Sequence, residues 1–321
     1  MKRNLVVFAA IIMAGVGCSK QDIATETEFQ PTAERKECAS HDVLEQQLAV
    51  DPTFRKNLAN LDEITRKLES GEIQMRISAD GNIEIPVVFN VIYRTTAENV
   101  PLSRLQSQID VLNDDYSATN SDYNSTPAAF QSARSGDVGI RFVLDAVYRK
   151  KTNKSSWSTN DAMKGTQGIR ATSPTTKLNI WVCNMGGGIL GYAQFPGGNP
   201  ATDGVVLDDA ATGVLSSGVY NLGRTATHEV GHWLNLRHIW GDDGTGCTGS
   251  DQVADTPNQG GSNGGCPTFP KISCSNTPNG DMFMNYMDYT YDRCMYMFTA
   301  GQKTRMLATF AAGGPRSSFA Q

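Results

Sequence analysis

The stretch HEVGHWLNLRH, residues 228–238, decides how this chain is interpreted. His228 and His232 are four residues apart, so on a helix they lie on one face and can bind one zinc ion through neutral imidazoles. Glu229 follows the first histidine, where its carboxylate can reach a water molecule on the metal. Three of the chain's four histidines fall in this stretch. Chance would place three unrelated histidines and a glutamate in this pattern in roughly one chain in ten thousand.

The third histidine, His238, reaches the same metal only if the chain changes direction. A straight helix from His228 would carry His238 away, so the chain must turn sharply after Leu234. Asn235 lies at that turn, and asparagine tolerates a left-handed backbone better than most residues other than glycine. We therefore expect His228, His232 and His238 to hold a catalytic zinc ion.

Patterns elsewhere in the chain predict an α/β (α+β) domain. Strands are expected at residues 83–93, 140–148, 178–183 and 204–207, and helices at residues 102–116 and 223–236. Residues 42–70 are typical of two short helices broken near Pro52. Residues 241–279 are rich in glycine and asparagine, and no long regular element is expected there.

A second motif, NYMDY at residues 285–289, follows the histidines. An HExxH motif with a third histidine and a later methionine turn resembles the metzincins. Residues 227–241 and 285–302 resemble the pappalysins, most closely their bacterial single-domain branch, and the similarity extends over about residues 83–313. The resemblance implies a twisted mixed sheet, an active-site helix and an irregular, disulfide-stapled C-terminal subdomain. Asn235 stands where the family usually has glycine.

The activity implied by this resemblance is that of a zinc endopeptidase. Zinc held by three neutral nitrogens keeps a fourth position for water and lowers the pKa of that water. Glu229 would take the water proton and deliver it to the leaving amine, while Tyr289 would donate to the oxyanion. Met287 would pack beneath the ligands, as an ordinary core methionine also would. The strand at residues 178–183 is expected at a sheet edge, where it would bind substrate by strand addition.

The N-terminus has the features of an export signal over residues 1–17, with a charged start and a short apolar run. Cys18 then resembles the lipidated cysteine of bacterial lipoproteins, the alternative being ordinary cleavage with Cys18 incidental. We expect an exported protein, either an outer-membrane or cell-surface lipoprotein or one secreted after processing. Residues 18–75 would form the lipoprotein N-terminus and a pro-segment, and residues 76–321 the catalytic domain.

Six cysteines remain beyond Cys18, namely Cys38, Cys183, Cys247, Cys266, Cys274 and Cys294. An oxidising compartment favours disulfides over a structural zinc site, and the sequence has no CxxC pair. Resemblance to the pappalysins implies the pairs Cys247–Cys274 and Cys266–Cys294.

The two cysteines left over, Cys38 and Cys183, allow two interpretations. Cys38 follows a basic stretch, where a thiolate could occupy the open zinc position and keep a precursor latent. A Cys38–Cys183 disulfide is the alternative. We favour the zinc switch because a disulfide would keep the pro-segment tethered after cleavage, which we expect near Met75-Arg76.

Two further features depend on acidic residues. Asp251, Asp255 and Thr256 lie in a carbonyl-rich loop that suits a structural calcium ion. The resemblance also implies calcium, because pappalysins carry it near the sequence that corresponds to Asp255 and Thr256. A solvated acidic loop is the alternative. Asp292 follows the methionine turn, beside Arg293. Because bacterial pappalysins often cleave before arginine or lysine, Asp292 favours basic residues on the primed side of the substrate.

The composition of the chain limits the classes of molecule that are expected to bind it. The net charge is −5 and no basic block alternates with aromatic residues, so nucleic acid is not expected to bind. A membrane contact is expected only through a lipid at Cys18, and the protein is expected to be a monomer that acts on proteins or peptides. Two other functions remain open, a zinc-dependent hydrolase of a non-peptide substrate and an inactive peptide-binding surface lipoprotein. The second would not need Glu229, which this chain keeps.

Overall fold

The computed structural model describes residues 38–74 and 81–319. The expected export signal, Cys18 and the expected cleavage site at Met75-Arg76 lie outside these residues. Within the part of the chain that is described, no helix is long and apolar enough to span a bilayer.

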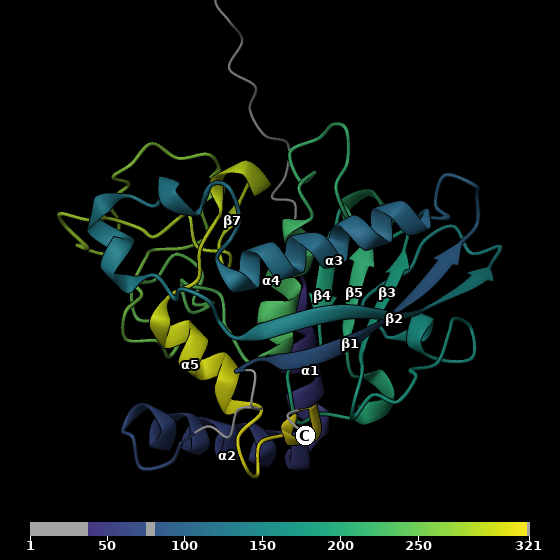
Figure 1. Ribbon diagram of the computed structural model, residues 1–321, viewed down its shortest axis with the longest axis horizontal. Coiled ribbons are helices and arrows are strands. Elements are labelled where there is room, and N and C mark those ends of the chain that lie inside the picture. The colour runs from purple at the N-terminus through teal and green to yellow at the C-terminus, as the bar shows by residue number, and fades with distance from the viewer. Residues whose placement is uncertain (1–37, 75–80, 320–321) are drawn as a thin grey trace, which may run out of the picture. The chain divides into compact units, whose positions relative to one another are not determined.

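A five-stranded mixed sheet forms the framework of the fold (Figure 1). Its strands are β1 (Ile83–Tyr93), β2 (Ile140–Lys151), β3 (Leu178–Cys183), β4 (Gly191–Ala193) and β5 (Val205–Asp208). They are ordered β2-β1-β3-β5-β4, and only β4 runs antiparallel to its neighbour. The predicted strands and mixed sheet are confirmed.

The expected edge position of residues 178–183 is wrong. These residues form β3, which lies between β1 and β5 and is buried along its whole length. A largely apolar run of this kind, interrupted here only by Asn179, is typical of a parallel strand covered on both faces. The edge next to the histidines is β4, whose three residues are too few to show a strand pattern.

Two helices cover one face of the sheet (Figure 1). They are α3 (Leu102–Ser117) and α4 (Arg224–Trp233). Leu105, Ile109 and Leu112 of α3 recur at helical spacing and are buried in one cluster with Val230 and Trp233 of α4. The apolar side of α3 therefore packs on the sheet, and it brings α3 against the helix that carries the histidines.

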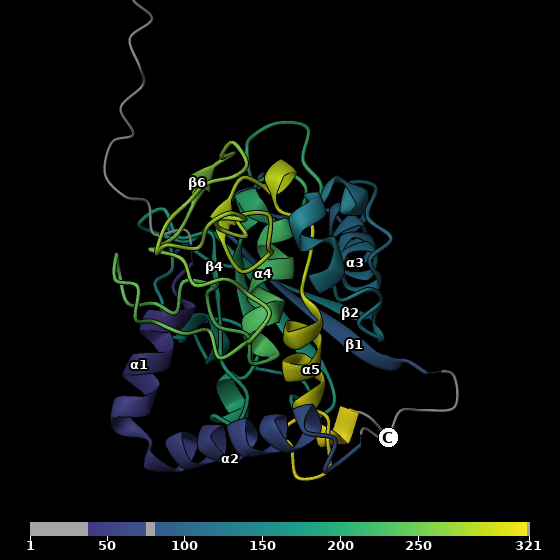
Figure 2. The ribbon, with the colours of Figure 1, turned by 90° about the vertical axis from the view of Figure 1, so that its left-hand side faces the viewer.

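The two N-terminal helices are α1 (Ser40–Val50) and α2 (Pro52–Glu69), as predicted. Asp51 caps α2, because its side chain accepts hydrogen bonds from the amides of Thr53 and Phe54 in the first turn. Pro52 occupies the first helical position, where its missing N–H costs no hydrogen bond. Figure 2 shows α2 passing beneath α5 (Ala300–Ala308), with which it shares an apolar cluster that includes Leu61 and Ala308. The 42–70 segment is thus packed onto the domain.

Helix α5 was not predicted, although Thr299 and Gln302 form a capping box at its start that signals a helix. The remaining elements are short. They are β6 (Gly264–Gly265), β7 (Tyr289–Thr290), η1 (Tyr123–Ser125), η2 (Ala128–Ala133), η3 (Ala162–Lys164), η4 (Pro200–Thr202), η5 (Asp209–Ala211), η6 (Asp292–Cys294) and η7 (Ser317–Phe319).

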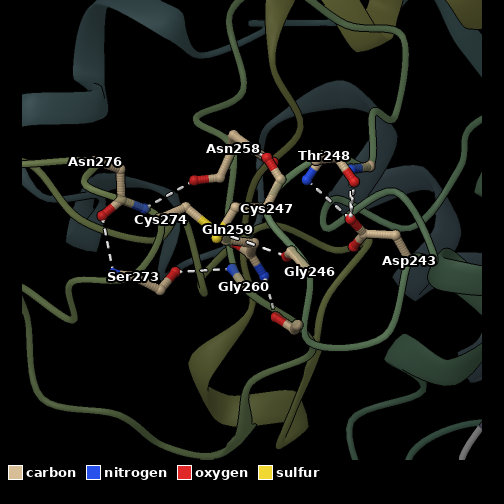
Figure 3. The surroundings of a disulfide bond; sticks show 12 residues. Asp243, Gly246, Cys247, Thr248, Asn258, Gln259, Gly260, Ser273, Cys274 and Asn276 are labelled. Atoms are coloured by element: carbon tan, nitrogen blue, oxygen red, sulfur yellow. Dashed lines mark hydrogen bonds between the residues drawn. A yellow bond between two sulfur atoms is a disulfide. The ribbon is translucent and has the colours of Figure 1, made fainter.

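Two disulfides staple the irregular subdomain, Cys247–Cys274 and Cys266–Cys294. Both pairings implied by the resemblance are confirmed. Around the first one, polar side chains bond to backbone groups of neighbouring loops, for example Asn258 to the carbonyl of Cys247 (Figure 3). The two disulfides stabilise loops whose own sequence has few apolar residues to form a core.

Candidate active site

Three imidazole nitrogens converge at the C-terminal end of α4. The Nε2 atom of His232 lies 3.1 Å from the Nε2 atoms of both His228 and His238. The helix ends after Trp233, and Asn235 takes a left-handed backbone with φ of 76°, which turns the chain back toward the site. The turn predicted at Asn235 is confirmed.

Each imidazole is held by a hydrogen bond to its other nitrogen. The Nδ1 atoms of His228, His232 and His238 bond to the carbonyl of Tyr286 (2.6 Å), the carbonyl of Leu236 (2.8 Å) and the carboxylate of Asp242 (2.6 Å), respectively. These acceptors place the protons on Nδ1 and turn the Nε2 lone pairs toward one another. Sequence reasoning missed the Asp242 contact, although Asp242 comes only four residues after the histidine that it holds.

This arrangement fits a tetrahedral zinc ion. Nitrogens about 2.0–2.1 Å from zinc would be separated by about 3.3–3.4 Å, close to the observed 3.1 Å. Burial lowers the pKa of His228 to about 3 and the pKa of His232 well below its ordinary value, which keeps both rings neutral. Neutral nitrogens that face one another as acceptors fit a cation placed between them.

Glu229 lies beside these nitrogens and is fully buried. Its Oε2 atom accepts from the Ser40 hydroxyl at 2.7 Å and from the Cys38 thiol at 3.5 Å. Its Oε1 atom has no hydrogen-bond partner within the described part of the chain. Burial raises the pKa of Glu229 to about 8 despite the two hydrogen bonds, which lower it.

Cys38 reaches the same point from the N-terminal segment. Its sulfur and the ring nitrogens of His228, His232 and His238 all lie within 4.8 Å of one another, and no other such group of three or more potential ligands occurs among residues 38–74 and 81–319. Burial and the charge of Glu229 raise the pKa of the thiol. Cys38 and Cys183 are both free thiols, so the alternative disulfide is not formed.

The methionine turn lies directly beneath the helix. Met287 is fully buried, and a side chain placed on Gly231 would come 2.5 Å from its sulfur. Glycine at position 231 therefore leaves room for the Met287 side chain against α4, and a larger residue there would displace that side chain. Tyr289 lies against the imidazole of His238, with ring centres 4.9 Å apart, and its hydroxyl donates to the carbonyl of Cys38 at 3.2 Å.

Comparison with known proteins identifies the family to which this site belongs. The family model described as pregnancy-associated plasma protein-A, which defines the pappalysin peptidases, matches residues 186–311. An extracellular metalloprotease of Arthroderma otae is 34% identical over 238 residues, covering 72% of this chain and 78% of that protein. This chain belongs to the pappalysin family. It is a metalloendopeptidase of the metzincin type, as its motifs predicted.

Solved structures of bacterial pappalysins share the fold. Mature mirolysin of Tannerella forsythia, in complex with a cleaved peptide, is 46% identical with a TM-score of 0.72, and the match covers 75% of this chain and 96% of mirolysin. A promirolysin mutant from the same organism is 41% identical with a TM-score of 0.79, and the match covers 88% of this chain and 96% of the promirolysin chain. The metzincin-type fold implied by the sequence is confirmed.

Two of the three residues proposed for calcium bond to each other in this pappalysin, while the third bonds to the start of α5. Asp251 accepts from the Thr256 hydroxyl at 2.8 Å, and burial raises the pKa of Asp251 to about 7. Asp255 is turned to the start of α5, where it accepts from the Thr299 hydroxyl and the Gly301 amide. Calcium binding therefore stays a prediction.

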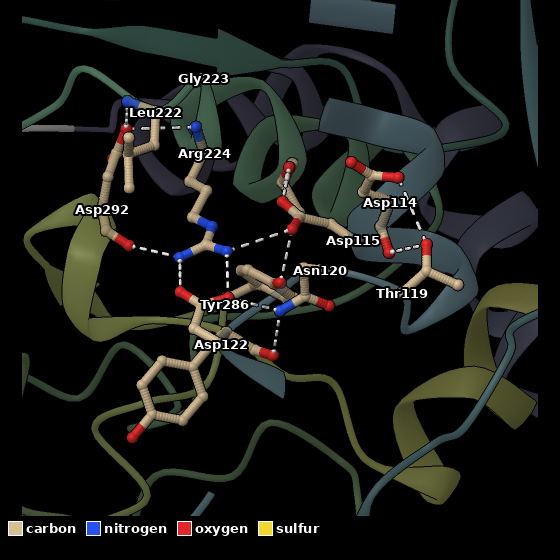
Figure 4. Close-up of polar contacts among 12 residues, drawn as sticks. Asp114, Asp115, Thr119, Asn120, Asp122, Leu222, Gly223, Arg224, Tyr286 and Asp292 are labelled. Carbon is tan, nitrogen blue, oxygen red and sulfur yellow. Dashed lines mark hydrogen bonds and ion pairs between the residues drawn. The ribbon is translucent and has the colours of Figure 1, made fainter. Parts of the chain in front are cut away.

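A pocket opens beside Glu229 and His228 and is lined by Tyr220, Arg224 and Asp292 among others. The Asp292 carboxylate is almost completely buried, and burial raises its pKa to about 6. The acid that sequence reasoning selected thus lies in the wall of the pocket next to the histidines. Arg224, which sequence reasoning missed, is the first residue of α4 and links the pocket to α3 (Figure 4).

Proposed function

We propose that this pappalysin is a zinc endopeptidase in which His228, His232 and His238 hold the metal and Glu229 is the general base. The observation that carries the proposal is the convergence of three Nε2 atoms beside a buried carboxylate. Zinc at this position would act as a Lewis acid on the substrate carbonyl and lower the pKa of water.

The protein's own side chains carry out the remaining steps of the reaction. Glu229 orients the attacking water, accepts its proton and passes the proton to the leaving amine. The Tyr289 hydroxyl donates to the carbonyl oxygen as negative charge develops on it, a role supported by its present bond to the Cys38 carbonyl. Met287 supports the histidines from below.

Substrate binds along β4 rather than along β3. The amide of Ala39 already donates to the carbonyl of Gly191 at 3.1 Å, and the Ser40 hydroxyl accepts from the amide of Ala193 at 2.8 Å. An extended chain can therefore bond to this edge, which is how strand addition binds peptides.

The form described here is a latent precursor, with residues 38–75 as part of the pro-segment. Cys38 lies within reach of the three imidazoles as a fourth ligand. Ser40 bonds to Glu229 and takes the place that a water molecule needs. The larger share of this chain matched by promirolysin, 88% against 75% for mature mirolysin, supports this assignment.

Three finer proposals complete the function. Asp292 gives the pocket a preference for basic side chains on the primed side. Asp251 and Thr256, with Asp255, are proposed to contribute to a structural calcium site. Export is supported by relatives named extracellular metalloproteases, with residues 1–17 as the signal; a lipid at Cys18 rests on the sequence alone.

The function is tested by hydrolysis of casein. Enzyme matured from the full-length precursor should cleave casein, lose activity with a zinc chelator and recover it when zinc is added back. Casein that stays intact under all three conditions, with a folded and processed enzyme, would reject the endopeptidase and favour a hydrolase of a non-peptide substrate.

A further inference from the structure

The acidic wall of the pocket is held by a residue that belongs to the active-site helix. The Oδ2 atom of Asp292 accepts from the amides of Leu222 (2.7 Å) and Arg224 (3.3 Å), while the guanidinium of Arg224 donates to the carbonyl of Asp292 at 2.8 Å. Asp292 is thus held by Arg224 through both its side chain and its backbone (Figure 4).

The Arg224 guanidinium also has a counter-ion that does not line the pocket. Asp122 binds it with both carboxylate oxygens, at 2.5 Å to Nη1 and 2.7 Å to Nη2. Such a bidentate pair is the strongest geometry available between arginine and a carboxylate. The next carboxylate, Asp115, is 3.5 Å from Nη2 and already accepts from the hydroxyls of Tyr286 and Thr227.

We infer that Asp122 is a specificity-determining positioning residue, which by pairing with Arg224 leaves the Asp292 carboxylate to receive a cationic substrate side chain. The inference rests on the proposed preference of the pocket for basic side chains. Asp122 lies in the loop after α3 and does not line the pocket. It acts on specificity only through Arg224.

The physical reason is charge balance in a buried cluster. Arg224 is 5% exposed, and a buried guanidinium that loses its partner is costly unless another carboxylate takes that place. The Asp292 carboxylate accepts from the amide of Arg224 and its carbonyl accepts from the guanidinium, so Asp292 lies beside the guanidinium and is placed to take over from Asp122. The pocket would then present a neutralised ion pair in place of a free carboxylate.

A structural role is the rival explanation. Asp292 and Arg224 also join η6 to the start of α4, so a substitution that weakens this contact could lower the stability of the fold without changing specificity. Stability changes act on all substrates equally, whereas the inference concerns the ratio between a charged and an uncharged substrate. The ratio of two kcat/KM values separates these roles because it does not depend on the amount of folded enzyme.

The test uses Asp122→Asn in the enzyme matured from the full-length precursor. Two peptides identical except for arginine or norleucine directly after the cleaved bond are compared. The wild type should prefer arginine, and in the variant the ratio should fall about tenfold, mainly through the KM of the arginine peptide, as expected when one nearby charge is removed from a partly buried site. Asp114→Asn is the control, because Asp114 lies near the end of α3, eight residues before Asp122, and accepts from the Thr119 hydroxyl outside the cluster.

Each outcome decides the inference. Asp122→Glu restores the charge and should recover most of the ratio. A ratio unchanged in Asp122→Asn overturns the inference while leaving the proposed specificity intact, and a wild type that favours norleucine overturns both. If Asp122→Asn does not fold, Asn120→Ala removes the amide that donates to Asp122 at 2.8 Å and should lower the same ratio.

Discussion

The bond between Asp242 and His238 predicts how tightly this protein binds zinc. The carboxylate accepts from the imidazole at 2.6 Å, and the carboxylate side chain is only 14% exposed. A carboxylate that accepts from a metal-binding imidazole orients the ring and raises the basicity of the other nitrogen. Replacing Asp242 by asparagine keeps an acceptor of the same size and removes the charge.

The magnitude follows from the kind of hydrogen bond. A bond to a charged group is about twice as strong as a neutral one, a difference of about 1 to 1.5 kcal/mol in net stability. Since about 1.4 kcal/mol corresponds to a factor of ten, Asp242→Asn should weaken zinc binding about tenfold. Asp242→Ala also frees the ring to rotate and should weaken it by about a hundredfold, the upper end for such partners.

The assay is competition for zinc between the matured enzyme and a fluorescent chelator of known affinity. On the proposed maturation, Cys38 is removed with the pro-segment and does not add a ligand in this assay. Asp243→Asn is the matched control, because Asp243 bonds to Thr248 and Gly249 within its own loop. A zinc affinity in Asp242→Ala within twofold of the wild type would refute the reasoning.

Three further predictions follow from the same site. Glu229→Ala should bind zinc and fold normally but lose activity by a factor of about 10⁴ or more, because general-base work and water positioning are lost together. Cys38→Ala in the full-length precursor should mature early or cleave peptides before processing, since the fourth ligand position is opened. Because burial raises the pKa of Asp292 to about 6, its carboxylate becomes neutral as pH falls below that value, so the preference for arginine over norleucine should weaken there.

Each of these three predictions has a control and a result that would contradict it. Metal content measured by mass spectrometry accompanies the Glu229 variant, and near-normal turnover with zinc present would reject the mechanism. Cys183→Ala is the control for Cys38→Ala, because Cys183 is the other buried free thiol; a Cys38 variant that stays fully latent counts against the switch. A substrate ratio that is constant between pH 5 and 8 argues against a role for Asp292.

Local sequence patterns were enough for most of the longer helices and strands and for the metal-binding candidates, but not for α5 or β4. The spacing of His228 and His232 has meaning on any helix, and Asn235 signals a turn by its own conformational preference, which its φ of 76° confirms. The strands at residues 83–93 and 178–183 were found because a run of apolar residues is visible without knowing what covers it. The disulfide pairs needed the family resemblance, since four cysteines allow three connectivities.

The tertiary structure decided what no local pattern contains. It made three-residue β4 the edge that pairs with the segment around Ala39, placed Ser40 on Glu229, and joined Asp122 to Arg224 across 102 residues of sequence. These contacts link segments far apart in the chain, and an aspartate or a serine looks the same in the sequence whether its partner is water or a buried side chain. Periodicity reports only which face of an element is buried, whereas the partner of a polar group depends on how separate elements pack.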